Sequence, residues 1–336
     1  MHVVTCPQPG DLALEERDKP VPAAGEVLVR IRRVGVCGTD MHIFTGNQPY
    51  LSYPRVMGHE LAGEVEEAPA ESGLEPGDPV YIIPYIACGD CVACRRAKPN
   101  CCTRIRVLGV HTDGGLAEFL SVPQAYVKKA EGITLEQAAM VEFLAIGAHA
   151  VRRGSVAAGQ KVLVVGAGPI GIGVALFSKL RGAEVTVLDG RADRLAFCSE
   201  QIGVDATVAL GETSPSVLER LSGGDFFDVV FDATGNPKAM EGGFAYVAHG
   251  GTYVLVSIVA AEISFSDPEF HKREMTLMGS RNATAEDFAT VVEAMRAGLV
   301  PTRALHTHSV SLAELPRAFP GWLDPSAGVI KAIVAC

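Results

Sequence analysis

The 336-residue sequence lacks a long hydrophobic run and a recognisable targeting segment. No stretch approaches the roughly 18 consecutive apolar residues that a membrane-spanning helix requires. The N-terminal residues, MHVVTCPQPGDLALEERDKP, contain no basic segment followed by an apolar one, which is the pattern of a secretory signal. Without a secretory route, the nine cysteines are not expected to form a disulfide framework. We therefore expect a cytoplasmic protein whose reduced thiols are available to a metal.

The sequence also has little positive charge. It contains 29 Lys and Arg residues against 39 Asp and Glu residues, a formal net charge of −10. Nucleic acids and anionic membranes would repel such a protein at long range, so neither is expected as a partner. A hydrophobic content of 48% with 36 glycines is typical of a well-buried α/β protein. The length indicates two domains, because single cores rarely grow beyond about 250 to 300 residues.

Five of the nine cysteines lie within the stretch IACGDCVACRRAKPNCC, residues 86–102. The pattern C-x2-C-x2-C-x6/7-C comprises Cys88, Cys91, Cys94 and either Cys101 or Cys102. Four thiolates around one tetrahedral ion leave no open position, so the pattern predicts a structural zinc. The stretch is too polar to build its own core, and the metal would supply much of its folding energy. An iron–sulfur cluster and buried thiols without a metal are the alternatives.

A second set of possible ligands lies upstream. VGVCGTDMH and VMGHELAGEV supply Cys37, Thr39, Asp40, His42, His59 and Glu60. The alternation in EVLVRIRRVGV, residues 26–36, predicts a half-buried strand that ends in a turn at Cys37. A thiol, an imidazole and nearby carboxylates on loops could hold a zinc whose fourth position is open to water or substrate, as in a catalytic site. A structural role for the histidine is the alternative.

Glu142 is a further candidate ligand. It lies in TLEQAAMVEFLAIGAHAVRRG, residues 134–154, where Thr134 and Gln137 have the spacing of a capping box and predict the start of an apolar helix. A carboxylate among apolar neighbours is costly to bury without a partner, and a metal would be such a partner. An ordinary ion pair or an exposed helix position is the alternative.

Residues 161–194, KVLVVGAGPIGIGVALFSKLRGAEVTVLDGRADR, predict a dinucleotide site. A strand, a glycine-rich turn, a helix and a second strand follow one another, so that backbone and helix N-terminus can bind a pyrophosphate. The candidate residues are Gly166, Gly168, Pro169, Ile170, Gly171, Asp189 and Arg194. Asp189 would accept hydrogen bonds from the ribose hydroxyls and repel a 2′-phosphate, which favours NAD. Arg191 and Arg194 could instead hold that phosphate, so NADP is the alternative.

Further apolar segments predict the rest of the fold. Residues 207–210, 228–231, 253–257 and 275–278 alternate with helical stretches and complete a doubly wound parallel sheet of about six strands. We expect a zinc-binding catalytic domain at residues 1–148, with its cysteine lobe at about 84–111. A Rossmann domain at 149–284 and a tail at 285–336 that returns to the first domain would follow.

In combination, GVCGTDMH, GHE, the cysteine pattern, VE and GAGPIG resemble the zinc-dependent medium-chain alcohol dehydrogenases over essentially the whole chain. GNQPYLSYPRVMGHE, LGVHTDGGLAEFLSVP, AHAVRR and SDPEFHKREMTLMGSRNATAEDF are similar to the branch that oxidises sugar acids at carbon 5, the L-galactonate and L-gulonate 5-dehydrogenases. The resemblance implies a GroES-like, mostly-β catalytic domain beside the Rossmann domain. It also implies two zinc ions per subunit, NAD, and a homodimer or homotetramer.

The resemblance implies roles for individual residues. Cys37 and His59 would hold a catalytic zinc, with Glu60 and Glu142 as ligands or close neighbours. Cys102, not Cys101, would complete the structural site. Carbon 5 of L-galactonate or L-gulonate would lose hydride to NAD, giving D-tagaturonate or D-fructuronate, as the C5 hydroxyl is deprotonated. Its proton would pass from Thr39 through the cofactor ribose toward His42.

The sequence leaves three other functions open: a polyol dehydrogenase, an L-threonine dehydrogenase, and a non-catalytic NAD-binding redox sensor.

A sugar acid needs a cation to bind its carboxylate in this acidic protein. Arg281 is the first candidate, because a guanidinium binds a carboxylate through two parallel hydrogen bonds. The other candidate substrate residues are Lys272 and Arg273 for the carboxylate, and Asn47, Gln48 and Tyr50 for hydroxyls.

The sequence departs from the family pattern at three places. Phe143 stands where proline usually follows the glutamate, Pro79 stands where a basic residue is common, and Cys101 is an extra thiol beside a ligand. The first departure is expected to alter how Glu142 approaches the metal, and the second to alter the local strand geometry.

Overall fold

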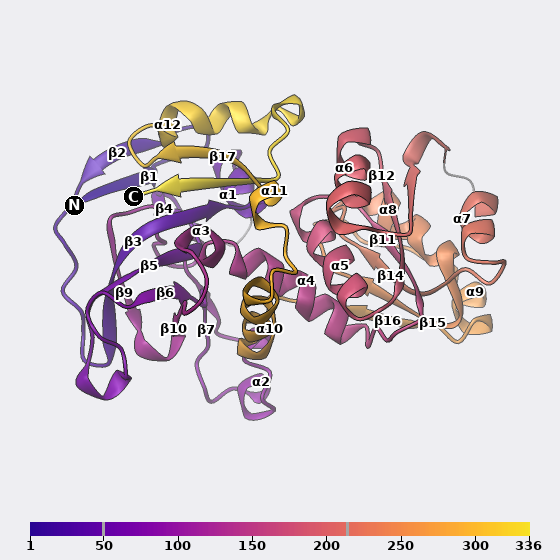
Figure 1. Ribbon diagram of the computed structural model, residues 1–336, viewed down its shortest axis with the longest axis horizontal. Helices are drawn as coiled ribbons and strands as arrows, with labels where there is room; N and C mark the ends of the chain where they lie inside the picture. The colour runs from indigo at the N-terminus through magenta and orange to yellow at the C-terminus, as the bar shows by residue number, and fades with distance from the viewer. Residues whose placement is uncertain (49–50, 213–214) are drawn as a thin grey trace. The chain divides into compact units, whose positions relative to one another are not determined.

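The computed structural model describes residues 1–48, 51–212 and 215–336. They form two compact units, one of residues 1–142 with 284–336 and the other of residues 143–283 (Figure 1). The first unit is mostly β and the second is a parallel α/β fold, so the predicted fold class is confirmed. Within the described residues, no helix combines the length and the apolar character needed to cross a bilayer.

The first unit is built on a seven-stranded sheet. Six of its strands run in the order β10-β6-β5-β3-β18-β17, and β9 also pairs with β3. Two smaller sheets have the orders β2-β1-β4 and β7-β8. The strands are β1 (His2–Cys6), β2 (Ala13–Glu16), β3 (Glu26–Val36), β4 (Arg55–Val56), β5 (Glu60–Glu67), β6 (Pro79–Ile82), β7 (Tyr85–Ile86), β8 (Arg106–Val107), β9 (Phe119–Pro123), β10 (Val127–Lys129), β17 (His306–Ser311) and β18 (Lys331–Ala335).

Strand β3 organises this unit. Its apolar residues are buried against the main core of the unit, as the alternation in the sequence predicts. It pairs antiparallel with β5, where Gly35 lies opposite Glu60, and antiparallel with β18, where Val36 lies opposite Ala332. Figure 1 shows the yellow C-terminal strands lying beside the indigo β3. This register brings the end of β3 next to the first residues of β5 and β18.

Pro79 is accommodated at the first position of β6, where proline is tolerated because the strand has only begun. It lies opposite Glu64 of β5, and its carbonyl accepts a hydrogen bond from the Ala130 amide at 2.7 Å. The strand geometry at Pro79, which the sequence left in doubt, is therefore that of a paired strand.

The segment from Thr134 contains two helices, and the prediction of one continuous apolar helix is wrong. Thr134 and Gln137 do form the predicted capping box at the start of α3 (Leu135–Ala138). The Met140 amide then bonds to the Gln137 carbonyl at 2.9 Å, which closes this short helix, and α4 (Val141–Arg153) follows. A Cβ on Gly35 would lie 2.8 Å from the Ala139 carbonyl, so the break occurs where the chain packs closely on β3.

The remaining helices of the first unit are short, except for one of twelve residues. They are α1 (Gly38–Phe44), α2 (Val92–Arg95), α10 (Ala285–Arg296), α11 (Thr302–Leu305) and α12 (Leu315–Ala318). Helix α2 lies within the cysteine lobe, and α1 begins directly after Cys37. Both metal-binding candidates are therefore associated with helix starts.

The second unit contains a six-stranded sheet with every pair parallel, in the order β13-β12-β11-β14-β15-β16. Its strands are β11 (Lys161–Val165), β12 (Glu184–Asp189), β13 (Ala206–Ala209), β14 (Phe227–Asp232), β15 (Val247–Leu255) and β16 (Thr276–Gly279). Its helices, besides α4, are α5 (Pro169–Leu180), α6 (Ala192–Phe197), α7 (Pro215–Leu221), α8 (Pro237–Gly243) and α9 (Asp267–Lys272). The sheet grows outward from β11 on both sides, as in doubly wound dinucleotide-binding folds.

Candidate metal and cofactor sites

Four cysteines of the lobe converge on one point. The sulfur atoms of Cys88, Cys91, Cys94 and Cys102 all lie within 4.8 Å of one another. The Cys91 and Cys94 sulfurs are 3.5 Å apart, and those of Cys88 and Cys102 are 3.4 Å apart. Cys101 is exposed and is not a member of this group. The structure thus brings together the four sulfurs that a tetrahedral zinc requires.

Backbone hydrogen bonds lower the pKa of two of the four thiols, Cys91 and Cys102, while burial raises the pKa of Cys94. Amides of Cys88 and Arg104 each donate a hydrogen bond to the Cys102 sulfur at 3.3 Å. Hydrogen bonds from the backbone at Cys94 and Thr103 lower the pKa of Cys91 to about 5. Thiolates are the form that binds metal, so this arrangement fits a structural zinc.

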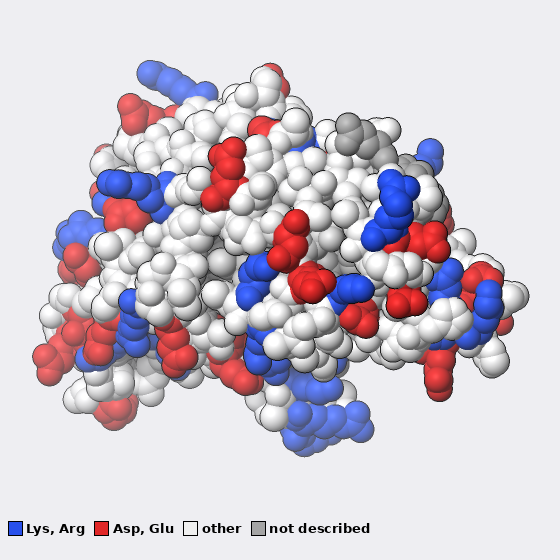
Figure 2. Space-filling model, turned by 45° about the vertical axis from the view of Figure 1, so that its right-hand side comes forward, with Lys and Arg blue, Asp and Glu red and all other residues white. Residues whose placement is uncertain are grey.

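Basic side chains surround the same lobe. Arg95, Arg96 and Lys98 are exposed on and just after α2, and Figure 2 shows Lys and Arg gathered at the lower edge of the face drawn. A zinc ion bound by four thiolates carries a net charge of −2, so nearby cations offset that charge. The lobe therefore carries a patch of positive charge, although the chain as a whole is acidic.

A second group of possible ligands forms where β3 ends and β5 begins. The ligand atoms of Cys37, His59 and Glu60 lie within 4.8 Å of one another. Cys37 precedes α1, and His59 and Glu60 follow β4. Thr39 is half-buried on α1, while His42 is exposed one turn further along the same helix. His59 and Glu60 are adjacent in sequence, and the β3–β5 pairing brings Cys37 to them.

Asp40 connects the two segments that carry Cys37 and His59. One oxygen of its buried carboxylate accepts the Cys37 amide at 2.9 Å, and the other accepts the Gly58 amide at 3.2 Å. The Asp40 carboxylate also lies 3.8 Å from the His59 imidazole. Burial by itself lowers the pKa of His59, but the charges of Asp40 and Cys37 raise this pKa well above its usual value. The sequence placed Asp40 among the possible metal ligands. Its position three residues after Cys37 is the spacing of a residue that caps the start of a helix, and in the structure it caps α1.

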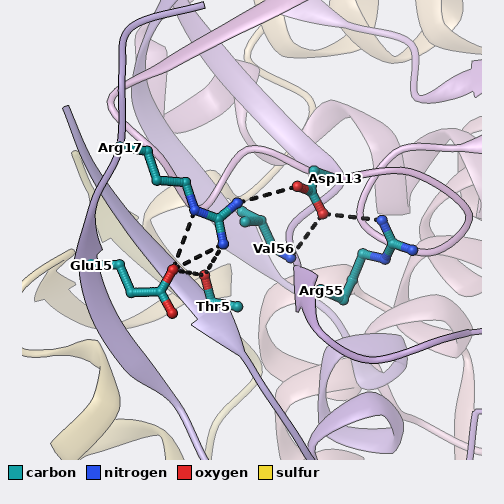
Figure 3. Close-up of polar contacts among 6 residues, drawn as sticks. All are labelled: Thr5, Glu15, Arg17, Arg55, Val56 and Asp113. Carbon is teal, nitrogen blue, oxygen red and sulfur yellow. Dashed lines mark hydrogen bonds and ion pairs between the residues drawn. The ribbon is translucent and has the colours of Figure 1, made fainter.

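A polar network fixes the chain just before His59. The carboxylate of Asp113 accepts hydrogen bonds from the Arg55 side chain at 3.0 Å and from the Val56 amide at 3.2 Å. Its second oxygen contacts Arg17, which also binds Glu15 and Thr5. Figure 3 shows Asp113 between the two arginines. Three distant segments thereby hold β4 in place, two residues before Gly58.

Glu60 forms a buried ion pair with Lys331. The Lys331 ammonium lies 2.6 and 2.7 Å from the two carboxylate oxygens of Glu60, and it donates to the Val36 carbonyl at 3.1 Å. Lys331 and Glu60 are 1% and 0% exposed. Lys331 carries no sequence signal for this contact, because only the pairing of β18 with β3 places it here.

We expect Lys331→Met to lower the free energy of unfolding by about 3 to 5 kcal/mol, because it leaves a buried carboxylate without its cation. Urea unfolding measures this change. Arg32→Met is the matched control, since the Arg32–Glu64 ion pair also involves a glutamate of β5 but is about one-third exposed on both sides and is expected to contribute less than about 1 kcal/mol. Equal losses for the two variants would contradict the assignment.

Glu142 lies in the first turn of α4 and is 3% exposed. The hydroxyl of Tyr85, itself buried in β7, donates a hydrogen bond to Oε1 of Glu142. Burial raises the pKa of Glu142 to about 7, although the His59 charge opposes this rise. The alternatives of an exposed position or an ordinary ion pair are wrong, since no cation of the described residues lies at ion-pair distance from Glu142. Tyr85 was not among the predicted residues.

Two buried atoms at this site support a metal. Within the described residues, Glu142 Oε2 has no hydrogen-bond partner, and His59 Nδ1 has none although the Asp40 carboxylate lies 3.8 Å from it. Buried polar atoms are normally paired, and unpaired ones commonly indicate a missing ion or water. One thiol, one imidazole and two carboxylates are also the ligand types that a catalytic zinc takes. The residues therefore fit zinc.

The second unit carries the glycine-rich turn. Gly166 has a φ of +96°, in the left-handed region, and a Cβ on Gly171 would lie 1.8 Å from the Gly166 carbonyl. Gly168 precedes α5, and a Cβ there would meet no atom within 4 Å. Pro169 and Ile170 form the first turn of α5 and are half-buried. The tight turn and the open space beside a helix N-terminus fit a dinucleotide.

Asp189 ends β12 beside this turn. Its two carboxylate oxygens accept the Ala167 amide at 2.6 Å and the Arg191 amide at 2.7 Å. Arg194 is 5% exposed, and burial lowers its pKa. The Arg191 side chain pairs with Asp193 at 2.7 Å. The turn therefore holds the acidic residue of the dinucleotide pattern in a fixed orientation.

The predicted substrate residues lie on both units. Asn47 is exposed and Gln48 half-buried, just after α1, while Tyr50 lies outside the described residues. In the second unit Arg281 is exposed, and the Lys272 ammonium lies 3.5 Å from the Glu269 carboxylate. The Arg273 side chain donates to the carbonyls of Ala245 and Val247, which is a structural role. These substrate residues stay predictions.

Comparison with known proteins agrees with both units. Residues 23–132 match the alcohol dehydrogenase GroES-like domain, and residues 169–297 match the zinc-binding dehydrogenase family. The chain is 43% identical to the L-galactonate-5-dehydrogenase of Escherichia coli K12, over 99% of this chain and 98% of that protein. It is 31% identical to the 2-dehydro-3-deoxy-L-galactonate 5-dehydrogenase of Pseudoalteromonas atlantica, over 94% and 93% of the two chains.

A solved structure also matches along the whole chain. An alcohol dehydrogenase from Escherichia coli CFT073, crystallised with NADH, has a TM-score of 0.93 and 29% identity, over 100% of this chain and 99% of that one. The resemblance drawn from the sequence motifs is therefore confirmed. With a four-cysteine cluster, a Cys–His–Glu group and a dinucleotide-binding turn, this chain belongs to the zinc-binding alcohol dehydrogenase family.

Proposed function

We propose that this dehydrogenase transfers hydride from the C5 hydroxyl-bearing carbon of a hexonate to NAD. L-galactonate, giving D-tagaturonate, is the first candidate substrate, and L-gulonate, giving D-fructuronate, is the second. The observation that carries the proposal is the 43% identity to an L-galactonate-5-dehydrogenase across 99% of the chain. Identity over the full length covers the substrate-binding segments as well as the zinc and nucleotide motifs.

Cys37 and His59 would hold the catalytic zinc, with Glu60 or Glu142 as a further ligand. When bound, the zinc supplies a Lewis acid that makes a hydroxyl more acidic, and the nicotinamide supplies the hydride acceptor. Asp40 orients the two protein ligands through its bonds to the Cys37 and Gly58 amides. Cys88, Cys91, Cys94 and Cys102 would hold the structural zinc.

Proton removal is the task of residues on α1. The half-buried Thr39 hydroxyl would accept the proton of the substrate hydroxyl at Oγ1 and give up its own proton in the same relay. His42 lies three residues further along the helix, on the same face, and is exposed. An exposed imidazole can release a proton to water. The two residues thus form the beginning and the end of a proton path to solvent.

NAD is the proposed cofactor because Asp189 presents a carboxylate at the end of β12, where a 2′-phosphate would be repelled. The Gly166–Gly171 turn and the N-terminus of α5 would hold the pyrophosphate, with Pro169, Ile170 and Arg194 beside it. The free thiols of all nine cysteines support a reducing compartment, so we propose the cytoplasm as its location.

A homo-oligomer is also proposed. Strand β16 is the edge of the six-stranded sheet, and its Leu277 side chain is 37% exposed. An exposed edge with an apolar side chain can pair with the same edge of a second copy. Light scattering would give the mass in solution, and a monomer at all concentrations would refute the proposal.

The proposed function is tested by following NADH absorbance with zinc-loaded protein, NAD and separate substrates. The panel contains L-galactonate, L-gulonate, L-idonate, sorbitol and L-threonine. We expect the largest kcat/KM for L-galactonate or L-gulonate, and loss of activity with a chelator that removes the catalytic zinc. Activity on sorbitol or L-threonine alone would refute the hexonate assignment, and silence across the panel would refute the dehydrogenase activity on these classes.

We expect Arg281→Ala to raise KM for the hexonate about tenfold while changing KM for NAD less than twofold. A guanidinium that binds the substrate carboxylate contributes roughly 1.5 to 3 kcal/mol, which corresponds to about a tenfold effect or more. Steady-state kinetics with each reactant varied in turn measures both values. Arg220→Ala, an exposed arginine of the same unit, is the control. Equal effects of Arg281→Ala on both KM values would overturn the assignment.

A further inference from the structure

The two carboxylates near Cys37 and His59 have different partners. Both oxygens of Glu60 contact the Lys331 ammonium, so its charge is already compensated. Glu142 instead accepts one neutral hydrogen bond, from the Tyr85 hydroxyl to Oε1. Its Oε2 is buried and has no partner in the described part of the chain. The charge of Glu60 is therefore compensated by Lys331, whereas Glu142 keeps one oxygen available to another ligand.

We propose that Tyr85 is a positioning residue for the catalytic metal. By occupying Oε1 of Glu142, its hydroxyl leaves Oε2 as the single oxygen offered to the ion held by Cys37 and His59. This inference rests on the metal site of the proposed function, not on its substrate. It makes Glu142, and not Glu60, the carboxylate whose negative charge is free for the metal.

The surroundings of Tyr85 hold its ring firmly. Tyr85 pairs with Val107 in the β7–β8 ladder, and its ring packs edge-on against Phe288 of α10, with centroids 6.2 Å apart. Phe288 is 0% exposed and is also stacked on Tyr81, at 6.1 Å. A donor fixed by packing can orient a ligand, whereas a mobile one cannot.

Glu142 is also coupled electrostatically to the residues of the proposed metal site. Its charge affects the pKa of His59, and the charges of Cys37 and Glu60 affect the pKa of Tyr85. Glu142 nevertheless lies outside the group of Cys37, His59 and Glu60 ligand atoms within 4.8 Å of one another. To bind an ion through either oxygen, Glu60 would have to share with the metal an oxygen that already contacts the buried Lys331 ammonium, which would weaken that ion pair. Glu142 has no such cost.

The proposal is tested with Tyr85→Phe, which removes one oxygen atom and keeps the ring against Phe288. Zinc affinity of the exchangeable site is measured by competition with a chromogenic chelator. We expect it to weaken about tenfold or more, the usual effect of removing a group that orients a metal ligand. The zinc of the four-cysteine cluster is the internal control, and its release should not change. Cobalt placed in the exchangeable site should show a shifted d–d spectrum.

Tyr81→Phe is the matched control, because Tyr81 packs on the same Phe288 but makes no contact with Glu142 in the structure. Its zinc affinity and cobalt spectrum should equal those of the unaltered protein. In a Glu142→Gln background, Tyr85→Phe should weaken zinc binding by less than about twofold, since the residue through which it acts is already altered.

Three results would overturn the proposal: unchanged zinc affinity in folded Tyr85→Phe, the same loss in Tyr81→Phe, or the same loss in the Glu142→Gln background. If Tyr85→Phe does not fold, Glu142→Gln alone decides, because its amide oxygen still accepts the Tyr85 hydrogen bond. Unchanged zinc affinity in Glu142→Gln would refute the role of Oε2. Because no readout is catalytic, inactivity on hexonates would refute the proposed function and leave this inference standing.

Discussion

Cys37→Ala is expected to lower kcat/KM for the hexonate about a thousandfold. The variant removes a thiolate from the group that would hold the catalytic zinc, and a Lewis acid at the reacting hydroxyl is worth several kcal/mol. A loss of about 4 kcal/mol of transition-state stabilisation corresponds to about a thousandfold in rate. The activity measured with NAD should therefore fall close to background.

The fold should survive this substitution. The capping bond at the start of α1 runs from the Cys37 backbone amide to Asp40, and alanine keeps that amide. The dinucleotide-binding turn belongs to the second unit, so NAD binding should not change. Circular dichroism, NAD titration and zinc analysis check these points, and one zinc per chain should remain.

Cys336→Ala is the control for Cys37→Ala, since Cys336 is also half-buried and belongs to neither cysteine group. It should retain full activity and both zinc ions. A Cys37→Ala protein that keeps two zinc ions and substantial activity would contradict the assignment of the catalytic site. An unfolded one would show that Cys37 has a structural role instead.

Cys91→Ala is expected to destabilise the protein, with a loss on the order of 4 kcal/mol and a fall in Tm of roughly 10 °C. The lobe has little core of its own, since Val92 is 48% exposed and Arg95, Arg96 and Lys98 are exposed as well. Metal ligation must therefore supply its stability. Calorimetry and limited proteolysis measure the two consequences, a lower Tm and cleavage within residues 86–106.

Cys101→Ala is the matched control for Cys91→Ala, because Cys101 lies in the same lobe but outside the group of four sulfurs. Its Tm and zinc content should equal those of the unaltered protein. If Cys101→Ala destabilised the lobe and Cys91→Ala did not, the choice of ligands would be wrong. If Cys91→Ala were stable but inactive while Cys37→Ala was unstable, the two metal sites would be exchanged.

Local patterns explain why much of the fold could be predicted. The strand, glycine turn and helix at residues 161–180 are adjacent in sequence, so their geometry follows from local preferences and from Gly166. The cysteine spacing constrains a short loop in the same way. The capping box at Thr134 was predicted correctly, but the end of α3 was not, because close packing on Gly35 interrupts the helical pattern.

The hydrogen-bond partners of Glu60 and Glu142 could be identified only from the tertiary structure. Tyr85 and Glu142 are separated by 57 residues, and Glu60 and Lys331 by 271. No spacing rule connects residues so far apart, because their contact depends on strand register. The choice between Glu60 and Glu142 as a metal ligand was therefore open from the sequence, and their different hydrogen-bond partners are the basis for proposing Glu142.

The sequence by itself determined the family, the two kinds of ligand set and the dinucleotide motif, because each depends on residue types at short, constrained spacings. Only the tertiary structure decided which buried groups compensate one another. The reason is physical. Whether the charge of a buried carboxylate is compensated depends on the few atoms in contact with it, and here those atoms come from strands that are distant in sequence and adjacent in space.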